Sequence, residues 1–349
     1  MARRLAIAAA ALMLAACGGS AKTSSSSTAG TGTTGTGTTG TGTAGTKTTA
    51  SSPAAAVDEL AAAERPVASQ FPSSSGKSLQ QLAKLAGSTA QLGAANGTFT
   101  PGFRRLAFAL TSSSQEFIYA PTAVYIAASP TAPVRGPFPA PADPMTVAPQ
   151  YRSRQNAAPG GLQAIYWTNL PAPQARTYDI LSLTRTSKGL TGATGEIAVA
   201  KHWPIPDVGQ RPPAIATDTL ASVHGKVSLL TTRVPPESMA SASFNQVLGK
   251  KPVLLLFSTP ELCHSRICGP VTDVAVQLQH QFGSRIVFIH QEVYADNNPT
   301  LGLRPQLKAF HLQTEPWVFA INRQGVVAAR LEGAFGVNEL RRAIQAALK

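Results

Sequence analysis

Residues 251–270 read KPVLLLFSTPELCHSRICGP. The five apolar residues 253–257 are too few for a helix and predict a strand that is buried on both faces. The Ser-Thr-Pro-Glu segment 258–261 has the spacing of a capping box and a proline suited to a first helical turn, so we expect a helix to begin there. Cys263 and Cys268 follow directly. A helix start stabilises a thiolate through its N–H groups and its dipole, so this stretch is suited to thiol chemistry.

The residues that follow predict an α/β domain at 246–349. The helix after the cysteines, expected at 270–282, carries apolar residues on one face and stops at Gly283. The other predicted elements are a short helix at 243–247, strands at 285–290, 317–321 and 326–331, and helices at 304–310 and 338–348. From the strand at 253–257 onward, the predicted order is β-α-β-α-β-β-α.

This order, with cysteines after the first strand and Pro316 just before the third, resembles the thioredoxin fold. The Asn-Arg-Gln-Gly turn at 322–325 and the strand after it are similar to the redoxin and TlpA-like branches of that family. The resemblance implies that Pro316 has a cis peptide bond and lies beside the cysteines, where it helps to present a backbone edge to the substrate. Glu315 and Trp317 flank this proline and are candidate substrate-binding residues, although core packing explains Trp317 equally well.

The spacing Cys263-x-x-x-x-Cys268 departs from the Cys-x-x-Cys motif of the thioredoxin family. On a continuous helix, residues five apart have Cα atoms roughly 8–9 Å apart, whereas a disulfide requires no more than about 7 Å. Either the segment between the cysteines is partly non-helical, or oxidation unwinds a turn. A peroxiredoxin branch shares this separation, but its Thr-Pro pair lies one residue closer to the first cysteine. We therefore expect a thiol-disulfide oxidoreductase rather than a peroxidase.

The two cysteines are interpreted as a redox-active dithiol, with Cys263 as the attacking thiolate and Cys268 as the resolving thiol. His264 and Arg266 are candidate supporting residues that would help to hold the thiolate charged. Two other interpretations stay open. The pair could form an inert structural disulfide, worth about 2 kcal/mol of stability, or it could bind a metal.

The metal interpretation follows from a resemblance to copper-delivery proteins of the Sco type. Those proteins place Cys-x-x-x-Cys in the same loop and add a distant histidine, and two thiolates with a histidine suit Cu(I). His290 and His311 are the candidates for that histidine, and each is also explained as a structural residue. We assign no cofactor and no metal to the site.

The N-terminus predicts the location of the protein. Residues 1–16 combine Arg3 and Arg4 with an apolar segment too short to span a bilayer, as in a signal peptide. The segment LAAC, which ends at Cys17, resembles the lipobox of bacterial lipoproteins, in which this cysteine becomes acylated. The resemblance implies a palmitate-carrying lipoprotein on the extracytoplasmic face of the cell membrane. Lipidation of Cys17 leaves two cysteines in a compartment where disulfides persist.

Composition divides the rest of the chain. Residues 17–53 are mostly Ser, Thr, Gly and Ala and predict a flexible tether, and 54–100 predict a helical and irregular lead-in. Residues 101–205 predict an all-β sandwich that resembles immunoglobulin-like domains, and 206–245 a Pro-rich connector. The strands expected in the sandwich are 105–110, 116–119, 123–127, 163–167, 178–183 and 195–200. The proline-rich run 129–149 predicts a long surface connection.

Lys and Arg exceed Asp and Glu by 13, but no run of basic residues is longer than two. This thin distribution favours weak attraction to anionic surfaces over a nucleic-acid interface. The sequence as a whole predicts a membrane-anchored thiol-disulfide oxidoreductase that acts on protein or small-molecule disulfides and thiols. The alternative is a non-catalytic thioredoxin-like lipoprotein that binds a metal such as copper or a partner protein.

Overall fold

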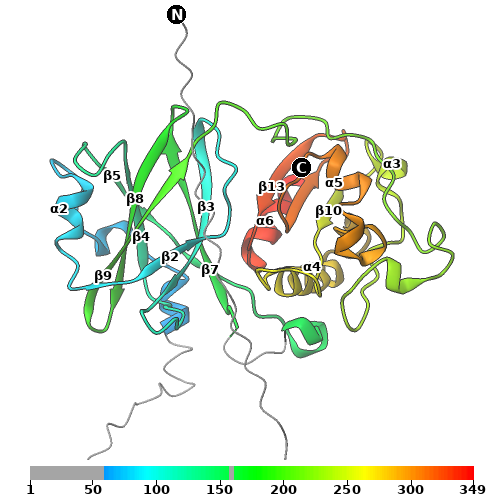
Figure 1. Ribbon diagram of the computed structural model, residues 1–349, viewed down its shortest axis with the longest axis horizontal. Helices are drawn as coiled ribbons and strands as arrows, with labels where there is room; N and C mark the ends of the chain where they lie inside the picture. Colours follow the sequence, from blue (N-terminus) through cyan, green and yellow to red (C-terminus); the bar gives the residue numbers. More distant parts are fainter. Residues whose placement is uncertain (1–58, 157–160) are drawn as a thin grey trace, which may run out of the picture. The chain divides into compact units, whose positions relative to one another are not determined.

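A computed structural model describes residues 59–156 and 161–349 of the chain (Figure 1). All of these residues belong to one unit. The signal peptide, the acylated Cys17 and the tether, predicted within residues 1–53, lie outside the described residues. Among the helices that are described, none has both the length and the apolar character needed to cross a membrane.

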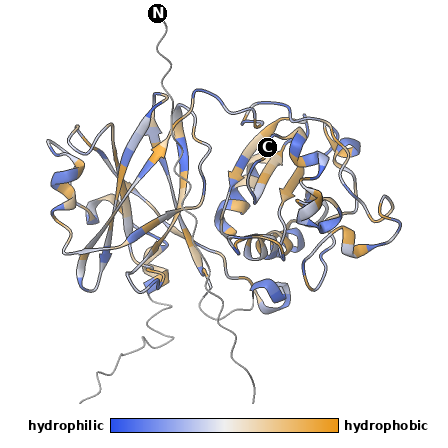
Figure 2. Ribbon diagram, in the orientation of Figure 1, coloured by the Kyte–Doolittle hydropathy of each residue, from blue (hydrophilic) through white to orange (hydrophobic). Residues whose placement is uncertain are grey.

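The C-terminal part is built on a four-stranded sheet with the order β11-β10-β12-β13. Its strands are β10 (Val253–Phe257), β11 (Val287–Gln291), β12 (Trp317–Ile321) and β13 (Val327–Glu332). β10 pairs in parallel with β11 and antiparallel with β12, and β12 pairs antiparallel with β13. β10 and β12 are buried throughout, as their unbroken apolar runs predict. In Figure 2 these two strands are largely orange.

Helices cover both faces of this sheet. They are α3 (Phe244–Val247), α4 (Cys268–Phe282), α5 (Pro305–Ala309) and α6 (Val337–Ala347). Leu254 and Leu256 of β10 pack with apolar residues of α4 and α6, whereas Val253 and Leu255 pack with residues of α3 and α5. Side chains that alternate along a strand produce these two separate cores. The predicted order β-α-β-α-β-β-α is confirmed, and apart from the helix start expected at 258–261, the element ends differ from the predicted ranges by no more than two residues.

The helix after β10 begins later than the capping-box spacing predicted. α4 starts at Cys268, and residues 260–267 form turns and irregular structure. Ser258 does not cap a helix, because its hydroxyl group lies 2.8 Å from the Thr272 hydroxyl group and 2.8 Å from the His290 ring. The prediction that a helix begins at 258–261 was therefore wrong. The Ser258 side chain belongs to a buried polar cluster, so it is not available to cap a helix.

Two further sheets form the N-terminal part of the described chain, so the protein as a whole is mixed α/β with several sheets. One sheet has the order β1-β9-β8-β4-β5 and the other β2-β3-β7-β6. Their strands are β1 (Ser88–Thr89), β2 (Gln91–Ala94), β3 (Gly102–Thr111), β4 (Thr122–Ala127), β5 (Arg135–Pro139), β6 (Ala142–Pro144), β7 (Ala164–Ala172), β8 (Thr177–Thr186) and β9 (Gly189–Ala198). Phe108 and Tyr166 from one sheet share a core with Val124 and Ile180 from the other. The immunoglobulin-like assignment of this two-sheet arrangement stays a prediction.

Two details of the predicted sandwich need correction. The proline-rich run 129–149 is more than a connection, because it contains β5 and β6, each at the edge of its sheet. Edge strands tolerate proline, since a residue there need not donate a ladder hydrogen bond. The strand expected at 116–119 is absent from the described structure, where Phe117 forms only an isolated bridge with Thr111.

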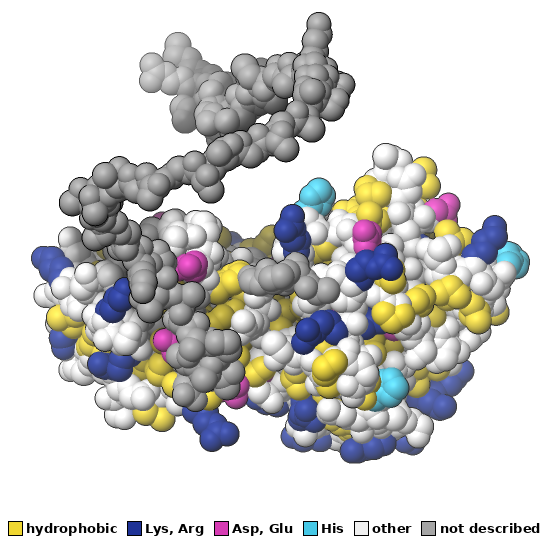
Figure 3. All heavy atoms as spheres, turned by 90° about the horizontal axis from the view of Figure 1, so that it is seen from below, with side chains coloured by type: hydrophobic (Ala, Val, Ile, Leu, Met, Phe, Trp, Pro, Cys, Tyr) yellow, Lys and Arg dark blue, Asp and Glu magenta, His cyan; other side chains and the backbone are white. Residues whose placement is uncertain are grey.

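Short helices occur in both the predicted lead-in and the predicted connector. α2 (Leu79–Ala83) lies in the lead-in, and the Ser78 hydroxyl group caps it by accepting a hydrogen bond from the Gln81 N–H. Between β9 and α3, the regular structure consists of one short 3-10 helix, Val227–Leu229. On the face shown in Figure 3, Lys and Arg side chains are interspersed with uncharged ones, as their thin spread along the sequence suggests.

Candidate functional site

Both cysteines lie where β10 leads into α4. Cys268 is the first residue of α4, and Cys263 lies in a turn before it, where the Arg266 N–H donates to the Cys263 carbonyl group at 3.2 Å. Arg266 adopts a left-handed conformation with a φ of 59°. Cys263 is 8% exposed and Cys268 is fully buried. The segment between the cysteines is therefore non-helical, which is one of the two solutions that their spacing required.

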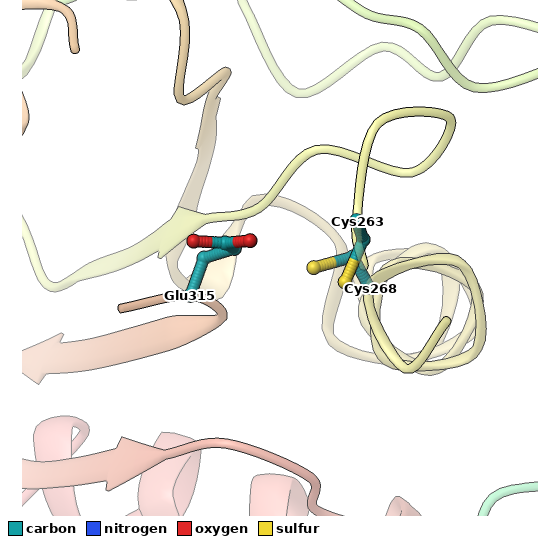
Figure 4. A group of neighbouring side chains, drawn as sticks. All are labelled: Cys263, Cys268 and Glu315. Atoms are coloured by element: carbon teal, nitrogen blue, oxygen red, sulfur yellow. The ribbon is translucent and has the colours of Figure 1, made fainter. Parts of the chain in front are cut away.

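A carboxylate completes the cluster. The sulfur atoms of Cys263 and Cys268 and a carboxylate oxygen of Glu315 all lie within 4.8 Å of one another. Figure 4 shows both sulfur atoms on the side of their backbone that faces Glu315, which comes from the segment before β12. Both cysteines are free thiols, and a disulfide requires their sulfur atoms to approach to about 2.05 Å. The turn that carries Cys263 is the element suited to this movement, because Cys268 is held by α4.

The surroundings of Cys263 favour its thiolate. A hydrogen bond from the Cys268 thiol lowers the pKa of Cys263 to about 5, against the opposing effect of burial, and the Ser265 hydroxyl group and the N–H groups of Cys268 and Ile267 add to this shift. The Ser265 oxygen lies 3.2 Å from the Cys263 sulfur. Both N–H groups belong to the start of α4, so the helix end supplies the stabilisation expected from the sequence. Cys263 is ionised at neutral pH.

Cys268 has the opposite tendency. Burial raises the pKa of the Cys268 thiol well above its ordinary value, and the neighbouring Cys263 raises it further. Burial and the charge of Cys263 also raise the pKa of Glu315, while His264 opposes this shift. At neutral pH the thiolate of Cys263 is therefore favoured, whereas Cys268 keeps its proton.

The two cysteines should differ in their rates of alkylation. With Cys17 replaced by serine, we expect iodoacetamide labelling of Cys263 to rise with pH through a midpoint of about 5, because the thiolate is the reacting species. Cys268 should label slowly between about pH 4 and 8. Mass analysis of peptides after short exposures measures both rates. Equal labelling at neutral pH would contradict the division of roles, and Cys268→Ala should raise the Cys263 midpoint because it removes the donated hydrogen bond.

Pro316 follows Glu315 and has the cis peptide bond that the family resemblance implied. Its carbonyl group accepts a hydrogen bond from the Gly333 N–H at 2.8 Å. Trp317 is fully buried, and its indole N–H donates to the Thr314 hydroxyl group at 3.1 Å. Trp317 therefore offers no exposed surface to a substrate and belongs to the core beneath the site. Substrate contact by Glu315 and Pro316 stays a prediction.

His264 and Arg266 are exposed. In the part of the chain that the structure describes, the hydrogen bonds to Cys263 come from its cysteine partner, from Ser265 and from backbone groups. A supporting role for His264 and Arg266 stays a prediction, and the contact of Ser265 with Cys263 was not predicted from the sequence. A hydroxyl group two residues after a cysteine, in a segment expected to turn, is a local signal that could have identified it. His311 is exposed and has a φ of 57°, and it does not belong to the cysteine cluster.

A buried chain of hydrogen bonds lies behind Cys268 and was not foreseen from the sequence. The His290 ring contacts the Glu237 carboxylate at 2.8 Å through Nδ1 and the Ser258 hydroxyl group at 2.8 Å through Nε2. The Ser258 oxygen lies 2.8 Å from the Thr272 hydroxyl group, which donates to the Cys268 carbonyl group at 2.7 Å. Both nitrogen atoms of His290 are thus engaged, and the chain fixes the first turn of α4 beneath the site.

The chain has a distant likeness among solved structures. A crystal structure from Chlorobium tepidum, described as a thiol:disulfide interchange protein DsbE, matches with 15% sequence identity and a TM-score of 0.29. The match covers 41% of this chain and 99% of that chain. No protein-family model and no curated protein matches the sequence. A TM-score this low assigns no fold, so we infer function from the geometry of the cysteines alone.

Proposed function

We propose that this protein is a thioredoxin-like thiol-disulfide oxidoreductase in which Cys263 and Cys268 cycle between the dithiol and the disulfide. The observation that carries the proposal is the pairing of an ionised Cys263 with a protonated, buried Cys268 at the start of α4. The strand order of the C-terminal sheet supports the thioredoxin-like assignment. An inert structural disulfide does not require such a difference in pKa between its two cysteines.

The reaction follows from this asymmetry. The Cys263 thiolate attacks one sulfur of a substrate disulfide, forms a mixed disulfide with it, and releases the other substrate sulfur as a thiolate. Cys268 then loses its proton and attacks the Cys263 sulfur, which forms the Cys263–Cys268 disulfide and releases the second substrate sulfur as a thiolate. The substrate is reduced by two electrons and the cysteine pair is oxidised by two. The same steps in reverse oxidise a substrate dithiol.

The proposed location is the extracytoplasmic face of the cell membrane, with the chain held by a lipid on Cys17. The lipobox and the short apolar segment within residues 1–16 support this location. The presence of three cysteines in the whole sequence also supports it, since lipidation would leave one pair for the chemistry. The substrates are then disulfides and thiols of proteins or small molecules outside the cytoplasm.

A redox titration tests the proposal. The full-length chain with Cys17→Ser is equilibrated in glutathione buffers of different ratios, and the free thiols are trapped with a maleimide and counted. We expect a reversible two-electron transition with a midpoint roughly between −270 and −120 mV, the range of thiol-disulfide oxidoreductases. Cys263→Ser is the control and should show no such transition. A midpoint below about −300 mV, which is typical of structural disulfides, or no transition at all would refute the proposal.

The metal-binding alternative fits the residues less well. Cu(I) prefers soft ligands such as thiolates and also accepts imidazole, but both nitrogen atoms of His290 are bound to Glu237 and Ser258. The third group at the cysteines is the Glu315 carboxylate, which is a hard ligand. Stoichiometric Cu(I) uptake that is lost in Cys263→Ser, in a protein without a redox transition, would favour this alternative over the proposed function.

A further inference from the structure

In the proposed reaction, the proton of the Cys268 thiol must pass to an acceptor before Cys268 can attack. Cys268 must become a thiolate to attack the mixed disulfide on Cys263. Its side chain is fully buried, and the pKa of its thiol lies well above the ordinary value. Bulk water does not reach this sulfur, so a side chain of the protein has to accept the proton and return it when the disulfide is reduced.

The buried groups behind Cys268 are poorly placed for this task. His290 uses both ring nitrogen atoms in hydrogen bonds, and its chain reaches the Cys268 carbonyl group through Thr272 rather than the sulfur. Glu292 is buried, and one of its carboxylate oxygens accepts from the Thr232 N–H at 2.6 Å and from the Thr232 hydroxyl group at 2.8 Å. Neither His290 nor Glu292 belongs to the cluster formed by the sulfur atoms.

We propose that Glu315 accepts the Cys268 proton as Cys268 attacks the mixed disulfide on Cys263, and returns it when the pair is reduced. This inference rests on the proposed function. A Glu315 carboxylate oxygen lies within 4.8 Å of both sulfur atoms, and Figure 4 shows the carboxylate facing them. One water molecule can bridge such a separation, and a general base acts either in direct contact or through one water.

The charges around Glu315 change during the reaction in the direction that this role needs. The titratable groups that interact electrostatically with its carboxylate are Cys263, Cys268, His264 and Tyr294. In the reduced protein, burial and the Cys263 thiolate raise the pKa of Glu315, which favours its protonated form. In the mixed disulfide, Cys263 carries no charge, so its effects on the pKa values of Glu315 and Cys268 both vanish. The ionised form of Glu315 is then favoured more than in the reduced protein, and the Cys268 proton is easier to remove, in the one intermediate where the transfer takes place.

The transfer is balanced in both directions. In oxidation, the Cys268 S–H bond breaks, its proton passes to the Glu315 carboxylate, a sulfur–sulfur bond forms to Cys263, and the substrate sulfur leaves with the electron pair of the mixed disulfide. In reduction, an incoming thiolate attacks Cys263, and Cys268 leaves as a thiolate that takes the proton back from Glu315. Glu315 thus exchanges a proton with a reacting sulfur atom and changes its protonation once in each half of the cycle.

The test separates the two chemical steps. The full-length chain with Cys17→Ser is mixed with 2,2′-dithiodipyridine, a neutral disulfide, and the release of thiopyridone is followed by stopped-flow absorbance. The first phase reports the attack by Cys263 and the second reports the attack by Cys268. In Glu315→Gln, we expect the second phase at pH 7 to slow by about a hundredfold, with the first phase changed by less than about threefold. Glu261→Gln, an exposed carboxylate outside the cluster, should change neither phase.

The pH profile distinguishes proton transfer from a merely structural effect. The wild-type rate of the second phase should rise as Glu315 ionises and then level off, whereas in Glu315→Gln it should rise only in the alkaline range, where Cys268 itself ionises. Glu315→Asp should keep the wild-type profile at a lower rate. A Gln variant with the wild-type rate and profile would overturn the inference. If Gln also abolished the first phase, an Asp variant whose second phase rises only in the alkaline range would overturn it instead.

The outcome also separates this inference from the proposed function. A wild-type protein that shows the first phase but no second phase, or neither, would refute the oxidoreductase assignment and the role of Glu315 with it. A wild-type protein with both phases, together with an unaffected Glu315→Gln variant, would leave the oxidoreductase in place and remove only Glu315.

Discussion

Serine in place of Cys263 is expected to abolish disulfide reduction, with a fall in rate of at least about a thousandfold. The pKa of Cys263 is lowered to about 5, so its thiolate predominates at pH 7, whereas a serine hydroxyl group does not ionise there and does not attack disulfides. The measurement is the turnover of a protein disulfide in the presence of an external thiol reductant. The background is the full-length chain with Cys17→Ser, so that no third thiol contributes.

The matched variant Cys268→Ser should fail at the next step. It keeps the nucleophile and therefore still forms the mixed disulfide, but it has no thiol to resolve that bond. We expect a covalent complex with the substrate that survives denaturing electrophoresis without reductant and disappears when reductant is added. Trapping by Cys263→Ser instead of Cys268→Ser would reverse the roles of the two cysteines, and trapping by neither would argue against a mixed disulfide.

The unusual spacing of the cysteines is compatible with these roles because of one turn. Cys263 lies outside α4, and the turn closed at Arg266 brings its sulfur back over the first residues of the helix. The N–H groups of Ile267 and Cys268 then act on the Cys263 thiolate from the helix end. The shorter Cys-x-x-Cys motif places both cysteines within the helix start. Here the longer segment between Cys263 and Cys268 forms the turn.

Much of the C-terminal fold could be predicted because its signals are local. Five consecutive apolar residues at 253–257 fit a short strand covered on both faces, and Gly283 ends α4 with a φ of 56°. The helix start expected at 258–261 was wrong because the capping-box signal depends on what else binds the capping side chains. Glu261 accepts a hydrogen bond at 2.6 Å from Gln155, which lies far away in the sequence.

The site shows the same limit. Cys263 and Cys268 could be identified from the sequence because they directly follow a predicted strand. Pro316 could be identified because it directly precedes a later one. The buried contacts that surround them come from segments with no local motif. Glu237 lies in an irregular connector, and nothing near it in the sequence indicates that its carboxylate contacts the His290 ring at 2.8 Å. Such contacts follow from how the chain packs and not from the pattern of any one stretch.

Loss of a buried ion pair between the connector and α4 is expected to have the largest effect on the free energy of unfolding. Arg233 and Asp273 are joined at 2.8 Å, and their side chains are only 3% and 0% exposed. The other Asp273 oxygen accepts from the Ser153 N–H at 2.8 Å and from the Asn156 amide group at 3.1 Å. The Arg233 guanidinium group also donates to the Tyr151 carbonyl group at 2.7 Å. The pair therefore ties the connector and the segment around residue 153 to the helix that carries Cys268.

Removing one partner leaves the other charge buried without compensation. We expect Arg233→Met and Asp273→Leu each to lower the free energy of unfolding by about 3–5 kcal/mol. The double variant should be less destabilised than the sum of the two by about 2 kcal/mol, because neither charge then remains buried alone. Urea unfolding followed by fluorescence measures all three. The control is Asp207→Asn, since Asp207 lies 3.7 Å from Arg104 and 3.5 Å from Arg330 with its own side chain partly exposed, and its loss should cost less than about 1 kcal/mol.

The double variant also separates packing from chemistry. If the pair acts only by compensating buried charge, the folded double variant should keep the wild-type alkylation midpoint of Cys263, because the groups that lower that pKa are the Cys268 thiol, Ser265 and the start of α4. A shifted midpoint would mean that Asp273 also sets the position of the helix end beneath the cysteines. Single variants that cost less than about 1 kcal/mol would show instead that water reaches the pair in solution and screens it, contrary to its burial here.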